Sequence, residues 1–151
     1  MMRKRILFVC LGNICRSPAA EGVFRGLVPE AETDSAGTAR YHVGKPPYGP
    51  MQAAARARGV ELSDLRARQF QSDDFLRFDL ILAMDSENLA DIEAQRPRDN
   101  NTPVQLFAPF AAGDGDQDVP DPYYTRDFEG CLDLIERAAS GLASHLQGGA
   151  L

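Results

Sequence analysis

A cysteine and an arginine stand six positions apart near the start of the chain, in the segment Cys10–Pro18 that follows the apolar run Ile6–Val9. A turn from a buried strand into a helix N-terminus directs several backbone N–H groups at one small volume, and such a volume binds anions. A thiolate is stabilised there and can act as a nucleophile. An arginine presents paired N–H groups that match two phosphate oxygens. The residues predict a phosphate-binding loop with Cys10 as nucleophile, formed by Leu11, Gly12, Asn13, Ile14, Cys15, Arg16 and Ser17.

Other residues of this segment have both a structural and a functional interpretation. The simple interpretation of Arg16 is a solvated surface charge. A cation at the start of a helix is, however, unfavourable next to the positive end of the helix dipole, and a bound anion would explain its presence there. Ser17 is expected to be the helix N-cap, with Pro18 at the first helical position, and its hydroxyl can also bond the Cys10 sulfur. Gly12 gives the turn backbone freedom, and Asn13 can adopt the left-handed conformation.

The elements that would position this loop alternate along the chain. Parallel strands buried on both faces read as continuous apolar runs, whereas helices show apolar residues at three- and four-residue spacing. Strands are expected at 4–10, 33–38, 78–84 and 104–107, helices at 17–27, 51–58, 85–94 and 126–147, a short helical turn from 72, and irregular loops at 39–50 and 109–125. This order predicts a single α/β domain, residues 1–151, with a four-stranded parallel sheet, helices on both faces and the ligand site at the carboxyl ends of the strands.

Composition excludes several classes of function. The 151 residues carry 16 Lys and Arg against 22 Asp and Glu, a net charge of −6, which argues against a sequence-independent nucleic-acid binder. No apolar run approaches the roughly 20 residues of a membrane span, and the one after Arg5 is too short for a signal peptide. Three cysteines do not make a disulfide framework in a chain of this length, which favours a cytoplasmic protein. No cluster has metal-ligand spacing, so neither a metal nor another cofactor is expected.

The loop Cys10–Pro18, combined with the downstream segment Asp121-Pro122-Tyr123-Tyr124, resembles the low-molecular-weight protein tyrosine phosphatases. The similarity covers nearly the whole chain, since 34–38, 67–69 and 78–85 also look like segments of that family. A Cys-x5-Arg loop alone is moderately specific, whereas its combination with the Asp-Pro-Tyr-Tyr segment is strong.

The resemblance implies a role for each matching residue. Cys10 would attack the phosphorus of a phosphotyrosine, the loop amides and Arg16 would hold the phosphate oxygens, and Asp121 would act as general acid and base. Without the family, Asp121 would be taken for a turn residue. The resemblance further implies an aromatic wall of Tyr41, Tyr123 and Tyr124, support of the loop by Asn13, Ser17 and Ser35, and trapping of an oxidised Cys10 by Cys15 as a disulfide.

Several questions stay open at the level of sequence. Many relatives have a histidine shortly before the 67–69 segment that helps to hold the loop asparagine, but Asp64 and Leu65 stand here, which leaves water or Ser35 to complete the Asn13 network. His42 could touch substrate, although a plain surface position is the simpler interpretation, and Cys131 is expected in the core. The alternatives are an arsenate reductase, which needs further cysteines that 71–95 lack, and a phosphoarginine phosphatase, which Ile14 and the paired tyrosines disfavour. The expected partner is a phosphotyrosine-containing protein or peptide, a tyrosine kinase among the candidates, bound by a monomer or weak homodimer.

Overall fold

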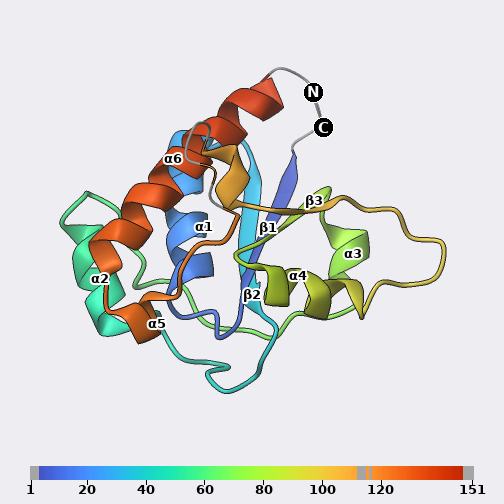
Figure 1. Cartoon of the computed structure of the whole chain (residues 1–151), viewed down its shortest axis with the longest axis horizontal. Helices are drawn as coiled ribbons and strands as arrows, with labels where there is room; N and C mark the ends of the chain where they lie inside the picture. The colour runs from blue at the N-terminus through green and yellow to red at the C-terminus, as the bar shows by residue number, and fades with distance from the viewer. Residues whose placement is uncertain (1–3, 112–114, 116, 148–151) are drawn as a thin grey trace.

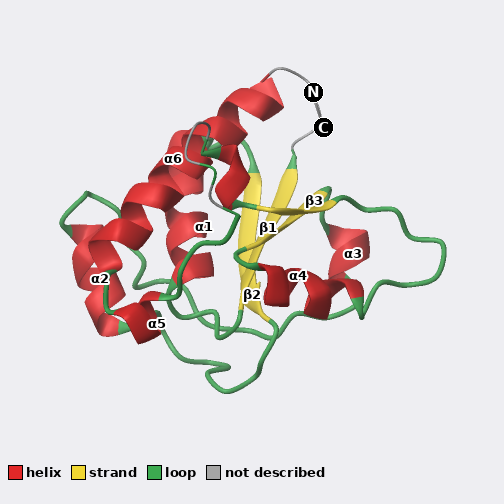
Figure 2. Ribbon diagram, in the orientation of Figure 1, coloured by secondary structure: helices red, strands yellow, loops and turns green. Residues whose placement is uncertain are grey.

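A four-stranded parallel sheet forms the centre of the protein (Figures 1 and 2). The computed structural model describes residues 4–111, 115 and 117–147. The strand order is β2-β1-β3-β4, and β1 pairs with β2 on one side and β3 on the other. This confirms the predicted sheet. Its strands are β1 (Arg5–Cys10), β2 (Glu32–Gly37), β3 (Leu80–Ala83) and β4 (Val104–Leu106).

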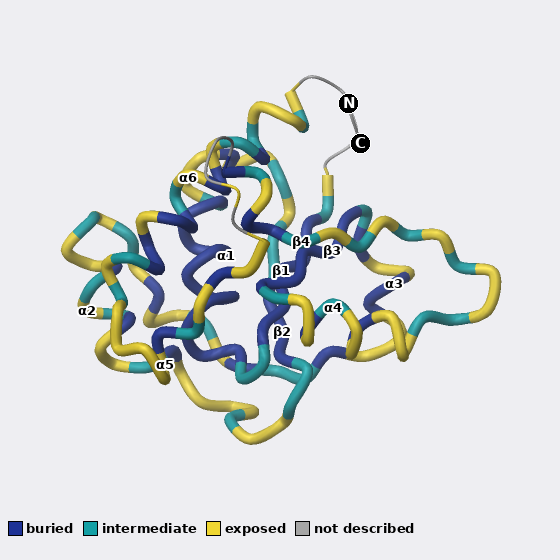
Figure 3. Tube along the Cα trace, viewed as in Figure 1, coloured by how far each residue is buried: buried dark blue, intermediate teal, exposed yellow. Residues whose placement is uncertain are grey.

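The central strand sends alternate side chains into two apolar clusters, one on each face of the sheet. Ile6 and Phe8 belong to the cluster shared with α1 (Arg16–Leu27) and α6 (Phe128–Gln147). Leu7 and Val9 belong to the cluster that includes residues of α3 (Asp74–Arg77) and α4 (Ser86–Glu93). Figure 3 shows the buried chain concentrated in these strands and in α1. The expectation of helices on both faces is confirmed.

Helix α1 begins one residue earlier than expected, and the predicted capping role of Ser17 is wrong. Cys15 is the N-cap residue, no side chain caps the helix, and Pro18 stands at its third position. The Ser17 hydroxyl is engaged by Asn13 and Cys10, so it is not used for capping. The absent N–H of Pro18 has no cost there, because the first four N–H groups of a helix have no partner within it.

Two other loops are shorter than the sequence indicated. Helix α2 is Gly49–Arg56, with Pro50 in its first turn, and so begins inside the predicted 39–50 loop. The predicted loop 109–125 contains part of a 3-10 turn, Ala108–Phe110, and the short helix α5, Pro122–Thr125, while residues 112–114 and 116 of it lie outside the described part. Asp121 caps α5 and is followed by Pro122 at the first helical position. An aspartate followed by a proline is typical of the start of a helix.

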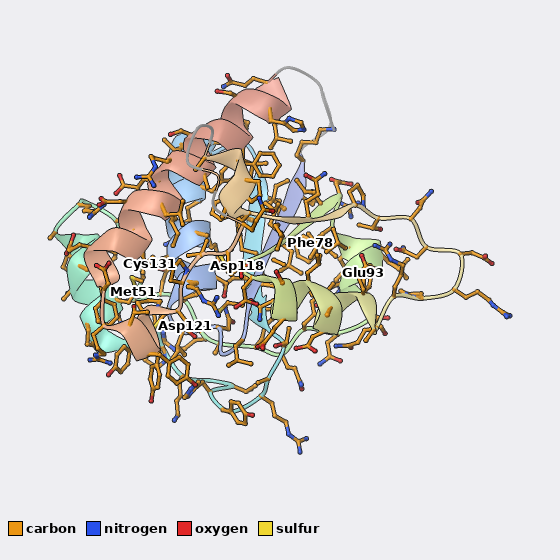
Figure 4. The ribbon with its side chains drawn as sticks, in the orientation of Figure 1. Met51, Phe78, Glu93, Asp118, Asp121 and Cys131 are labelled. Atoms are coloured by element: carbon orange, nitrogen blue, oxygen red, sulfur yellow. The ribbon has the colours of Figure 1, made fainter. Side chains whose placement is uncertain are left out.

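The carboxyl end of the sheet brings distant segments of the chain together. Asp85 caps α4 by accepting a hydrogen bond from the backbone N–H of Asn88 at 2.8 Å. The N–H of Val119 donates to the carbonyl oxygen of Met84 at 2.7 Å, which fixes the segment leading to Asp121 beside the end of β3. In Figure 4, Asp121 lies near the first turn of α1 and next to α5. No helix of the described residues has the length and apolar character that a membrane crossing requires.

Candidate active site

The Cys10 sulfur lies buried at the end of β1, where two donors approach it. The backbone N–H of Asn13 donates to Sγ at 3.2 Å, and the Ser17 Oγ lies 3.0 Å from Sγ. Helix α1 starts six residues later in the chain, so its N-terminal dipole and free amides face the same region. These donors are directed at the position that the Cys10 sulfur occupies.

The orientation of the Asn13 side chain leaves the Ser17 proton available for the Cys10 sulfur. Its Oδ1 accepts from the backbone N–H of Arg68 at 2.9 Å, so its Nδ2 must supply both remaining bonds, to Ser17 Oγ at 2.8 Å and Ser35 Oγ at 3.0 Å. Because Ser17 accepts from Asn13, its own proton is free to point at the sulfur, the nearer of its two possible acceptors. Asn13 has φ +58°, the left-handed conformation expected from its residue type.

A buried carboxyl group completes the Asn13 network. The Ser35 hydroxyl accepts from Asn13 and donates to Glu21 Oε1 at 2.7 Å. Glu21 is only 6% exposed. Burial raises the pKa of this carboxyl group to about 7, while the hydrogen bond from Ser35 acts in the opposite direction. The Asn13 network therefore ends on Glu21 at one side and on the Arg68 backbone at the other.

The Arg16 guanidinium is buried and joins three segments of the chain. Its side chain is 2% exposed, and Nη1 donates to Asp85 Oδ2 at 2.7 Å and to the Val119 carbonyl at 2.9 Å. Nη2 lies 3.4 Å from Asp121 Oδ2, whereas the buried Nε has no protein partner among the described residues. Burial alone would lower the pKa of Arg16, but the nearby Cys10, Asp85 and Asp121 raise it. The group is thus held as a cation with donor capacity to spare.

The remaining predicted residues line one pocket with Cys10. Asp121 Oδ1 accepts from the backbone N–H of Tyr123 at 3.0 Å, which leaves Oδ2 on the side of Arg16. The tyrosines are exposed at the rim, Tyr41 by 74% and Tyr124 by 71%. Gly12 does not have the left-handed conformation. Instead, the absence of a side chain leaves room for His42, because a Cβ at this position would lie 3.0 Å from His42 Cδ2. The described lining is Cys10, Leu11, Gly12, Ile14, Cys15, Arg16, Tyr41, His42, Asp121, Tyr123 and Tyr124.

Some residues of the site gave little or no signal in the sequence. Asp85 was recognisable as a helix cap, but not as the partner of Arg16. Glu21 reads as an ordinary polar position of an amphipathic helix, and the contribution of Arg68 is a backbone N–H group. His42 belongs to the pocket rather than to a plain surface position. Within the part of the chain that the structure describes, no group of three metal-ligating side chains lies close enough to hold an ion.

The two other cysteines are buried thiols. Burial raises the pKa of both Cys15 and Cys131, and the charge of Cys10 acts in the same direction on each. Cys15 lines the pocket, and Cys131 lies in the apolar cluster under α6, the core position expected for it. All three cysteines are free.

Comparison with known proteins gives a uniform result. The family described as low molecular weight phosphotyrosine protein phosphatase matches residues 5–149. A putative low molecular weight protein-tyrosine-phosphatase of Synechocystis is 44% identical over 94% of this chain and 96% of its own. The crystal structure of YfkJ from Bacillus subtilis superposes with a TM-score of 0.92 at 36% identity, covering 100% of this chain and 99% of that one.

A third relative gives the same result. The crystal structure of a protein tyrosine phosphatase from Entamoeba histolytica has a TM-score of 0.92 at 35% identity and covers 98% of this chain and 99% of its own. The agreement of sequence and fold over essentially the full length assigns the chain: it belongs to the low molecular weight protein tyrosine phosphatases, a family of phosphate-ester hydrolases.

Proposed function

We propose that the protein hydrolyses phosphotyrosine in proteins or peptides, with Cys10 as nucleophile and Asp121 as general acid and base. The observation that carries the proposal is the pair of hydrogen bonds to the Cys10 sulfur at the N-terminus of α1, in a pocket that also contains Arg16 and Asp121. A stabilised thiolate, a fixed cation and an acid in one pocket are the groups that phosphoryl transfer through a cysteine requires.

In the first step, the Cys10 thiolate attacks phosphorus and the bond from phosphorus to the phenolic oxygen breaks. The loop amides and the spare N–H groups of Arg16 stabilise the charge on the non-bridging oxygens. The leaving oxygen takes a proton from Asp121, whose Oδ2 is the oxygen not used to cap α5.

In the second step, water attacks the phosphorus of the cysteinyl phosphate. Asp121, now a carboxylate, accepts a proton from this water, the sulfur–phosphorus bond breaks, and Cys10 leaves as a thiolate. The Ser17 hydroxyl, which points its proton at the sulfur, stabilises this leaving group as it did the attacker. Inorganic phosphate and the original thiolate result.

The aromatic side chains suit a phenolic substrate. Tyr41 and Tyr123 lie at the rim of the pocket with His42 between them, at centroid distances of 6.4 Å to each tyrosine. Such an arrangement can flank a planar ring by stacking and edge contacts. Arsenate has no ring with which such contacts could form.

Two variants test the mechanism. Cys10→Ser is expected to abolish hydrolysis of p-nitrophenyl phosphate, since a serine hydroxyl at that place is not ionised. Asp121→Asn keeps an oxygen to cap α5 but cannot give a proton, so we expect a loss of roughly 10²–10⁴-fold with phosphotyrosine, and a smaller loss with p-nitrophenyl phosphate, whose leaving group is more acidic. Equal losses with both substrates would contradict the role of Asp121 as acid.

A comparison of substrates tests the specificity. Steady-state hydrolysis of phosphotyrosine and phosphoarginine peptides and thiol-dependent reduction of arsenate are measured on the same preparation. We expect kcat/KM to be highest for phosphotyrosine. Faster turnover of phosphoarginine would instead indicate a phosphoarginine phosphatase, and faster turnover of arsenate would indicate an arsenate reductase.

A further inference from the structure

A second hollow lies beside the catalytic pocket, and its charge is opposite to that of the whole chain. Its described lining consists of Arg40, Val43, Arg68, Gln69, Gln71 and Arg77. The protein carries a net charge of −6, yet none of these lining residues is a carboxylate. Its lining residues belong to the segment that follows β2, to the segment that leads into α3, and to α3 itself, and these elements can be followed in Figure 1.

One short stretch of chain separates the hollow from the catalytic pocket. Tyr41 and His42 line the catalytic pocket, whereas Arg40 and Val43, directly before and after them, line the hollow. The N–H of Val43 donates to the carbonyl of Arg40 at 3.4 Å and closes this stretch into a turn. A peptide whose phosphotyrosine occupies the catalytic pocket therefore needs to cross only this turn to reach the hollow.

The three arginines contribute differently. Arg68 is held by Asp34, through Nε at 3.0 Å, and by Asp74, through both terminal nitrogens at 3.1 Å, so its charge is largely compensated. Arg40 and Arg77 are exposed and make no hydrogen bond or ion pair through their side chains with the described residues. The positive charge of the hollow thus comes from the exposed guanidinium groups of Arg40 and Arg77 beside the fixed one of Arg68, although Arg77 also borders a neighbouring hollow that contains Glu32 and Asp34.

We propose that this hollow binds the carboxylate of an aspartate or glutamate that lies near the phosphotyrosine in the same substrate chain. Guanidinium groups recognise carboxylates through paired hydrogen bonds, and the glutamine side chains supply further donors. The protein would then prefer phosphotyrosine sites flanked by acidic residues. The proposal rests on the proposed function and specifies its substrate class.

Binding to an inactive variant tests the proposal without turnover. Fluorescein-labelled phosphotyrosine peptides carry a single Glu at each position from three before to three after the phosphotyrosine, and each is paired with the same peptide carrying Gln. Their Kd values for Cys10→Ser are measured by fluorescence anisotropy. We expect about 3- to 5-fold tighter binding of the Glu peptide at one or two positions, the size of an exposed ion pair, and a smaller ratio at high salt.

Substitution of the two free arginines locates the effect. In the Cys10→Ser background, Arg40→Gln with Arg77→Gln is expected to bring the Glu to Gln ratio to about 1, whereas Arg98→Gln, an exposed arginine of the loop before β4, keeps it. Equal Kd values for the Glu and Gln peptides in every pair would overturn the proposal. So would a Glu to Gln ratio that is unchanged by the double substitution, or one that is lost to the same extent in Arg98→Gln. Turnover of the same peptides by the unaltered protein decides the proposed function separately.

Discussion

The Ser17 hydroxyl accepts a hydrogen bond from Asn13, so its own proton can be donated to the Cys10 sulfur 3.0 Å away. Ser17→Ala removes the hydrogen bond to the Cys10 sulfur and the acceptor of one N–H of Asn13, but it removes no cap of α1, because Ser17 does not cap this helix. A hydrogen bond to a charged group contributes about 1.5–3 kcal/mol, so both kcat and the rate of Cys10 alkylation by iodoacetate at pH 6 should fall by roughly 10- to 100-fold.

The matched control is Ser72→Ala. This substitution removes the hydroxyl of an exposed serine that does not line the pocket of Cys10. This variant should keep the rates of the unaltered protein. Alkylation of Ser17→Ala at the unaltered rate would show that the hydroxyl donates elsewhere, to the Ala36 carbonyl at 3.5 Å.

Cys15 is proposed to trap an oxidised Cys10. Peroxide converts the Cys10 thiolate to a sulfenic acid, and the Cys15 thiolate then attacks its sulfur, so that hydroxide leaves and a disulfide forms. Burial raises the pKa of Cys15, so little of it is thiolate at neutral pH. The rate of disulfide formation, followed by mass spectrometry after acid quenching, should therefore rise about tenfold per pH unit near neutrality.

Cys15→Ala serves as the comparison for this trap. After peroxide treatment, the variant should recover less activity on addition of thiol, because an untrapped sulfenic acid is oxidised further to irreversible forms. Recovery equal to that of the unaltered protein would contradict protection by Cys15.

At the scale of secondary-structure elements, Glu21 joins α1 to β2 and makes the stability of this junction depend on pH. Burial raises the pKa of the folded carboxyl group to about 7, from 4.5. Between these values the folded chain retains a proton that the unfolded chain has lost, so the free energy of unfolding falls as the pH rises through this window. The contribution of the Glu21 proton to the free energy of unfolding is fully present below about pH 4.5 and is lost above about pH 7. It amounts to roughly 3 kcal/mol.

Glu21→Gln tests this dependence, since glutamine has the same shape and does not titrate. The slope of unfolding free energy against pH, measured by urea denaturation from pH 4.5 to 7, should become flatter in the variant. Glu30→Gln, which alters an exposed glutamate, should keep the original slope. If the slope of Glu21→Gln equals that of the unaltered protein, other groups produce the dependence.

At the scale of the whole molecule, the sequence predicted the sheet and the turn from β1 into α1 because both depend on local patterns. The apolar runs of β1 and β3 and the spacing of Cys10 and Arg16 are visible in the chain itself. The presence of Asp121 in the same pocket as Cys10 was expected only from the resemblance, because the two residues are far apart in the chain. The contacts of Asp85 and Glu21 could not be predicted, because they depend on the direction in which a side chain leaves its helix or cap.

Arg16 connects the first loop, the cap of α4 and the segment before α5, so an anion bound to it should stabilise the entire fold. Inorganic phosphate at 100 times its Kd should raise the free energy of unfolding by about 2.7 kcal/mol. For a chain of 151 residues this corresponds to an increase in Tm of roughly 5–10 °C. Differential scanning calorimetry against phosphate concentration, at constant ionic strength, measures the increase.

Arg16→Met retains the length of the buried side chain but removes its charge and donors. The increase in Tm with phosphate should disappear, whereas Arg98→Met should retain it. Without phosphate, the free energy of unfolding of Arg16→Met should lie within about 2 kcal/mol of that of the unaltered protein. The reason is that the side chains of Asp85 and Asp121 are 23% and 22% exposed and can be hydrated. An increase with phosphate that persists in Arg16→Met would mean that the anion stabilises the fold without this residue, through the amides of the loop alone.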